Sequence, residues 1–170
     1  MLHLMGGLCV IAGSAVIGLQ LVAQRRRRLE EGRQMRFACR LMERELSCRE
    51  PDLSELLETA ARQSSGVVRD FFNACRSQLE ELGNRPFAVI WQDNLNQAGL
   101  SLRRQEQELL AGLGTILGRY DRTVQCTALG RVAAELEERL QEAESQAQKQ
   151  NKLYMTLSIA GGMLLVVLTC

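Results

Sequence analysis

The chain has 170 residues, of which 21 are Lys or Arg and 20 are Asp or Glu, so its formal net charge is +1. This balance excludes a protein that binds nucleic acid through a broad basic surface, because such a surface must neutralise many phosphates. The single histidine, His3, excludes a Ser-His-Asp or Cys-His catalytic set in the body of the chain. We therefore predict a protein that is not an enzyme and binds no metal or cofactor.

The charged residues all lie in the middle of the chain. Residues 1–24 form a mostly apolar run that would rise about 36 Å as a helix, enough to cross a bilayer. Residues 153–170 form a second uncharged run of about 27 Å, near the lower limit for a span. The sequence predicts a transmembrane helix at each end, over 1–24 and 153–170, and a charged domain over 25–152 between them.

A cluster of four arginines, Arg25, Arg26, Arg27 and Arg28, follows the first apolar run directly. Basic residues beside a membrane span mark its cytoplasmic side. We interpret the cluster as a topology signal rather than a nucleic-acid patch, and two lysines before the second run support the same orientation. The protein is expected to be integral to the cell membrane, with the charged domain in the cytoplasm.

The cysteines are scattered singly along the chain, without a CxxC pair, at Cys9, Cys39, Cys48, Cys75, Cys126 and Cys170. A domain in the reducing cytoplasm keeps its thiols free. We predict isolated thiols rather than a disulfide framework or a zinc site.

The middle of the chain has helical periodicity almost throughout, and no segment alternates as a strand would. Apolar residues recur every three or four positions in six segments: Met35, Ala38, Met42 and Leu46; Leu53, Leu56, Leu57, Ala60 and Ala61; Val67, Val68, Phe71, Phe72, Cys75, Leu79 and Leu82; Phe87, Ile90, Trp91 and Leu95; Leu102, Leu109, Leu113, Ile116 and Leu117; Leu129, Val132, Leu136, Leu140, Ala143 and Ala147. The predicted fold is all-α, an antiparallel bundle of about six helices whose first and last helices extend into the transmembrane segments.

Helix ends are predicted from capping and breaking residues. Pro51 ends the first helix, and Asp52 with Glu55 three residues later predicts a capping box for the second. Gly99 ends the fourth helix, and Ser101 is expected to cap the fifth. Trp91 is expected in the core, where its indole N–H needs an acceptor, whereas an exposed Trp91 would indicate an interface.

The stretch "LLAGLGTILGRYDRTVQ", residues 109–125, is rich in glycine but does not fit a phosphate loop. Such a loop follows a strand or ends in Lys-Ser or Lys-Thr, and neither is present. Instead, Gly114 and Gly118 lie one helical turn apart and allow another helix to approach, and Gly118 can end the helix in a left-handed conformation. Asp121 is expected to cap the last helix, with Gln125 one turn later, although a partner-binding role for this pair stays open.

The segment "LGTILGRYDRTVQ" resembles the signature of the stage III sporulation protein AB family of endospore-forming bacteria. That signature has two Leu-Gly pairs followed by Asp and Gln, which Gly114, Gly118, Asp121 and Gln125 match. The resemblance extends to the basic end of the first apolar run, a Trp in the fourth helix and a Gly-Gly pair in the second run. Tyr120 departs from the family, which often has a smaller or aliphatic residue there.

The resemblance implies a role in the channel complex that links mother cell and forespore. The family's soluble part is similar to the cytoplasmic domain of the type II secretion inner-membrane platform protein F. By that analogy the protein is a platform component in the mother-cell membrane around the forespore, in contact with the cytoplasmic ATPase, the stage III sporulation protein AA, and other channel subunits. A homo-oligomer is left open, and the alternative is a self-assembling membrane scaffold unrelated to secretion.

Overall fold

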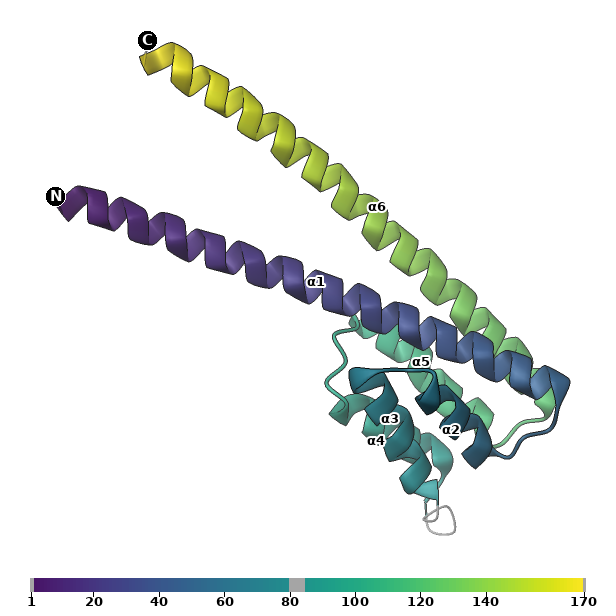
Figure 1. The fold of residues 1–170 in the computed structure, drawn as a ribbon. Helices are drawn as coiled ribbons and strands as arrows, with labels where there is room; N and C mark the ends of the chain where they lie inside the picture. The colour runs from purple at the N-terminus through teal and green to yellow at the C-terminus, as the bar shows by residue number, and fades with distance from the viewer. Residues whose placement is uncertain (1, 80–84, 170) are drawn as a thin grey trace. The chain divides into compact units, whose positions relative to one another are not determined.

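The computed structural model describes the backbone of residues 2–79 and 85–169, and the side chains of residues 20, 22–79 and 85–146. Six α-helices and no strand occur in these residues, which confirms the predicted all-α class (Figure 1). The helices are α1 (Leu2–Cys48), α2 (Leu53–Arg62), α3 (Gly66–Ser77), α4 (Phe87–Gln97), α5 (Arg104–Leu117) and α6 (Arg122–Thr169).

The chain divides into two units, residues 1–136 and 137–170, which are described separately. The first holds α1 to α5 and the beginning of α6, and the second holds the remainder of α6. All packing described below lies within the first unit. The predicted domain boundaries, after residue 24 and after residue 152, stay predictions.

Both long helices extend into the apolar terminal runs without a break, as predicted. Among the helices in the described part of the chain, none combines the length and the apolar character needed to cross a membrane. The predicted spans, 1–24 and 153–170, fall mostly on residues whose side chains lie outside the described ones. Both spans therefore stay predictions, as does the topology signal of the arginine cluster.

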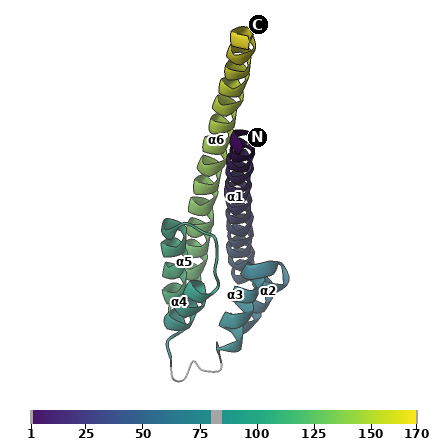
Figure 2. The same ribbon diagram turned by 90° about the vertical axis from the view of Figure 1, so that its left-hand side faces the viewer.

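The core of the first unit is formed by two helical pairs, α2 with α3 and α4 with α5, together with the second half of α1 and the beginning of α6. Figure 2 shows the two pairs. The predicted inward face of α1 is buried, with Met35 and Met42 fully covered. In α4, the predicted residues Phe87, Ile90 and Trp91 are buried as well. Periodicity thus identified the inward faces of both helices, while two predicted positions, Leu82 and Ala147, lie outside the described side chains.

Aromatic rings occupy the centre of this core. The Trp91 ring meets Phe71 edge-on at a centroid distance of 4.8 Å and lies 5.8 Å from the ring of Phe87. Phe72 packs edge-on against Phe71 at 5.1 Å. Such offset and edge-on pairs are favourable beyond the area they bury, so the seam between α3 and α4 is well fixed.

Three predictions about helix ends and faces are wrong. Asp52 is the N-cap residue of α2, but its side chain makes no capping hydrogen bond. Ser101 does not cap α5, because that helix begins three residues later and the Ser101 N–H is bound by Glu31 of α1. The inward face of α5 includes Leu110, which is fully buried, whereas the predicted Leu109 is only half-buried.

Candidate functional site

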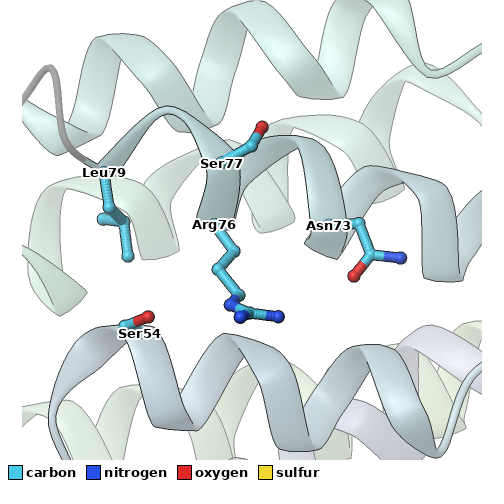
Figure 3. Close-up of a pocket in the computed structure, with 5 residues that line it drawn as sticks. All are labelled: Ser54, Asn73, Arg76, Ser77 and Leu79. Atoms are coloured by element: carbon cyan, nitrogen blue, oxygen red, sulfur yellow. The ribbon is translucent and has the colours of Figure 1, made fainter.

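A pocket of about 540 Å³ opens between α2 and α3, and its described lining consists of Ser54, Asn73, Arg76, Ser77 and Leu79 (Figure 3). The Arg76 side chain extends towards α2 (Figure 3). Its guanidinium lies 3.7 Å from the Glu58 carboxylate. No general base occurs among the described lining residues, where a lone arginine with hydroxyl and amide groups could contact an anion.

The described side chains form no candidate metal site, because no three His, Cys, Asp or Glu residues among them lie together. His3 lies outside those side chains. Four cysteines, Cys39, Cys48, Cys75 and Cys126, are free thiols, as predicted. Burial raises the pKa of Cys39 and of Cys75 to about 12, so both thiols stay protonated and unreactive. The predictions for Cys9 and Cys170 fall outside the described side chains.

The motif glycines lie where α5 meets α4. A Cβ atom on Gly114 would be only 2.7 Å from the Trp91 Cβ, and one on Gly118 would be 2.9 Å from the Phe87 Cβ. Two aromatic residues one turn apart on α4 therefore fit over two glycines one turn apart on α5, which confirms the predicted close approach. Gly118 has φ of −91°, so its predicted left-handed conformation is wrong. The space that Phe87 needs explains the glycine instead.

Trp91 is a core residue, as predicted. Its side chain is fully buried, and its indole N–H donates a hydrogen bond of 2.8 Å to the Leu110 carbonyl oxygen. A buried tryptophan with a satisfied donor stabilises the seam between α4 and α5. It presents no surface to a partner, so any effect of Trp91 on assembly would act through the position of α5.

Asp121 and Gln125 join the end of α5 to the start of α6. An Asp121 carboxylate oxygen accepts a hydrogen bond of 3.4 Å from the Thr123 backbone N–H, in the first turn of α6. The Gln125 amide donates to two backbone carbonyls, those of Leu117 at 3.2 Å and Tyr120 at 2.7 Å. These bonds satisfy groups that helix ends otherwise leave unpaired. The local role predicted for Asp121 is thus present, and a partner-binding role stays a prediction.

We expect Asp121→Ala to lower the free energy of unfolding by about 0.5–2 kcal/mol, because α6 loses its N-terminal cap. Urea unfolding of the full chain followed by circular dichroism measures the change. Asp70→Ala is the matched control, since the Asp70 side chain is 73% exposed on α3 and should leave stability within about 0.5 kcal/mol of wild type. Unchanged stability together with lost complex assembly in Asp121→Ala would assign the residue to a partner contact instead.

A buried polar cluster links α1 to the start of α5, and we did not predict it. Arg28, the last of the four arginines, turns inwards and forms an ion pair with Glu106. Its side chain is 13% exposed, and that of Glu106 is 2% exposed. A second Arg28 contact, from Nε to Glu106 Oε2, measures 3.2 Å. The four arginines therefore are not equivalent, because Arg28 stabilises the contact between α1 and α5 whatever role the cluster has at a membrane.

Glu31 forms the second half of this cluster. One of its carboxylate oxygens accepts a bond of 2.5 Å from the Ser101 N–H, and the other accepts a bond of 2.7 Å from Arg27 Nε. The Glu106 carboxylate also accepts from the Arg103 N–H at 2.7 Å, which caps α5. Two glutamates thus bind the backbone just before α5 and fix this helix against α1.

Burial alone would raise the pKa of Glu106, because it disfavours the charged form. The hydrogen bonds from Arg28 and from the Arg103 N–H, with the nearby positive charges, outweigh that effect and hold the pKa below its usual value. The carboxylate therefore stays ionised and paired at neutral pH.

Acid should weaken the fold through Glu106. Because its pKa is lower in the folded than in the unfolded chain, unfolding takes up a proton and the stabilising contribution is present above the unfolded pKa of about 4.3. It is lost as the pH falls through the folded pKa. We expect the melting temperature to fall more steeply between about pH 5 and 3 in wild type than in Glu106→Gln. Parallel slopes in thermal melts across this range would contradict this prediction.

The fold and these side chains define an all-helical protein whose motif residues hold one helix junction together. The chain belongs to the stage III sporulation protein AB family, whose model matches residues 3–170. This is a family of sporulation proteins and not a known enzyme family, so the chain has a role in sporulation.

Two relatives agree with this assignment. The chain is 27% identical over 170 residues to stage III sporulation protein AB of Bacillus subtilis (strain 168), and the match covers 99% of both chains. A solved structure of a stage III sporulation protein AB is similar with a TM-score of 0.64 and 29% identity. That match covers 73% of this chain and 98% of the solved one. The resemblance carried by the glycine, aspartate and glutamine motif therefore identified the family correctly.

Proposed function

We propose that the protein is a membrane-anchored platform component of a secretion-like channel complex between mother cell and forespore. The observation that carries this proposal is the family match over residues 3–170, which includes both apolar terminal runs.

The proposed location is the outer forespore membrane, with the helical domain on the mother-cell side. The arginine cluster after the first apolar run supports this orientation. The proposed partners are the cytoplasmic ATPase, stage III sporulation protein AA, and other subunits of the channel. An analogy at the level of the fold, to the type II secretion platform protein F, supports the ATPase contact.

The test is purification of a tagged full-length chain from membranes of sporulating cells, followed by mass spectrometry of what co-purifies. We expect the ATPase and the other channel subunits in the purified material and the tag in the membrane fraction. A protein that is made in vegetative cells and purifies only with itself would instead favour the self-assembling scaffold.

A second experiment examines the ATPase contact directly. The purified full chain, in lipid and in detergent, is immobilised and incubated with the ATPase. Retention of the ATPase in both conditions is the expected result. If the chain retains the ATPase neither in lipid nor in detergent, the ATPase is removed from the proposal. The other channel subunits are then left to be tested.

A further inference from the structure

The second half of α1 has an exposed face that is rich in arginine. Its members are all exposed and follow each other at steps of four and three residues: Arg26, Glu30, Arg33, Phe37, Arg40 and Arg44. This spacing places them along one line of the helix, opposite the buried Met35 and Met42. The line rises about 27 Å from its first member to its last. We name it the Arg–Phe stripe.

Phe37 lies in the middle of the stripe and is 49% exposed. The other three phenylalanines of the chain, Phe71, Phe72 and Phe87, are buried in the core. Half of the Phe37 ring therefore stays in water, where a partner that covered it would gain free energy. Aromatic and arginine side chains are the residues most enriched at the energetic centres of protein interfaces, and the stripe combines both.

The stripe carries an excess of positive charge, because four of its six members are arginines and one is a glutamate. Arg40 forms an ion pair of 2.9 Å with Glu43, in which both side chains stay partly exposed. Neither Arg26 nor Arg44 forms an ion pair with another residue that the structure describes. Arg40 and Arg44 lie one helical turn apart, where like charges repel. A partner with negative charge would relieve this repulsion.

The length of α1 decides between lipid and protein as the source of that negative charge. α1 runs from Leu2 to Cys48 as one helix. When residues 1–24 anchor the chain in the membrane, as in the proposed function, Phe37 lies about 20 Å along the helix axis beyond the end of the span. The headgroup layer is only about 5–8 Å thick, so anionic lipid can reach Arg26 but neither Phe37 nor Arg44. This favours a protein partner.

We propose that the Arg–Phe stripe is a docking surface for another protein, one that presents acidic side chains around an apolar recess. Phe37 enters the recess, and the arginines on either side of it contact the acidic side chains. The proposal rests on the proposed function in one respect, the membrane span over residues 1–24. It does not depend on the ATPase contact.

The experiment is photo-cross-linking from position 37 of the full-length chain in sporulating cells. Phe37→p-benzoylphenylalanine keeps an aromatic ring at this position, and mass spectrometry identifies the peptides that it captures. We expect a cross-link to a peptide of another protein, and we expect that peptide to carry a net negative charge. Val89→p-benzoylphenylalanine is the matched control, because Val89 is 41% exposed on α4 and lies outside the stripe. It should not capture this peptide.

Charge reversal tests the electrostatic part of the contact. Adding Arg44→Glu should lower the yield of the cross-link from position 37 at least about fivefold, because it brings like charges together. Arg119→Glu is the matched control, since Arg119 is exposed at the end of α5, and it should leave the yield unchanged. Replacing an acidic residue of the captured peptide by lysine should restore the yield in Arg44→Glu.

Several results would overturn the proposal. Position 37 could give no cross-link above the level of position 89, which would make the stripe a solvated face. It could capture lipid, or a second copy of this chain, instead of another protein. The captured peptide could be neutral or basic, or the yield could be unchanged in Arg44→Glu, and either result would exclude docking through charge.

The same experiment separates this inference from the proposed function. An acidic partner that is not a subunit of the channel would support the stripe and contradict the proposed function. Conversely, channel subunits that co-purify with the tagged chain while none is captured from position 37 would support the proposed function and contradict the stripe.

Discussion

We expect Glu106→Leu to lower the free energy of unfolding by about 3 kcal/mol, because Arg28 would be left charged and unpaired in a largely buried place. The expectation lies at the lower end of the usual range, since the Arg28 side chain keeps 13% exposure and can reach some water. Urea unfolding of the full chain, with and without the substitution, measures the difference.

The matched control for this experiment is Glu108→Leu on the same helix. Glu108 pairs with Arg104 at 2.9 Å, but these side chains are 63% and 90% exposed, so the change should stay within about 0.5 kcal/mol. The double variant Arg28→Met with Glu106→Leu should recover the part of the stability that the unpaired Arg28 charge removes, while the loss of the bond from the Arg103 N–H remains. A double variant as unstable as the sum of the single ones would contradict this account of the ion pair.

The second large effect is expected for Gly114→Ala, which should lower the free energy of unfolding by about 1–3 kcal/mol. The new methyl group would lie 2.7 Å from three Trp91 atoms, Cβ, Cγ and Cδ1. Trp91 cannot turn away easily, because its indole N–H is bound to the Leu110 carbonyl at 2.8 Å. The seam between α4 and α5 must therefore open.

Gly112→Ala is the control, two residues away on the same helix. Its methyl group would meet nothing within 4 Å, so it should raise the free energy of unfolding by about 0.5–1 kcal/mol through helix propensity alone. Trp91 is the only tryptophan, and its fluorescence reports directly on the seam. A red-shifted emission maximum is expected for Gly114→Ala and not for Gly112→Ala. Equal effects of the two substitutions would contradict the close approach.

Much of the fold could be predicted because apolar periodicity records burial directly. In α4, Phe87, Ile90 and Trp91 recur at helical spacing, and all are buried. The close approach at Gly114 was predictable from two glycines one turn apart. The predicted inward face of α5 was less accurate. Leu109 and Leu110 are adjacent and both fit an apolar stripe, so only the packing in the structure shows which of them is buried.

The polar cluster could not be predicted in the same way. Arg28 belongs to a run of four arginines beside an apolar segment, a pattern that already has an explanation at a membrane surface. Its partner Glu106 is 78 residues away, and no local pattern records such a pairing. One signal was available, because Glu106 precedes Leu110, Leu113 and Leu117 at steps of four, three and four, so a charged residue occupies the inward line of α5.

The capping errors have a related cause. Ser101 has the side chain of a good N-cap, but Glu31 of α1 binds its backbone N–H at 2.5 Å, so this residue is fixed by tertiary contact rather than by the helix. The cap of α5 comes from its own first turn, where the Glu106 carboxylate accepts a hydrogen bond from the Arg103 N–H. Propensity describes an isolated helix end, and here another helix determines where the end lies.

The unbroken course of α1 has a mechanical consequence. From Leu2 to Cys48 it contains no proline and no interruption at which a bend could concentrate. The N-terminal part of α1 therefore acts as a lever arm. A sideways force on its first turns is transmitted to Arg28 and Glu31, the residues that hold α1 to α5. A tilt of the N-terminal part of α1 must either move α5 with it or break these bonds. The position of the start of α5 therefore depends on the orientation of the N-terminal part of α1.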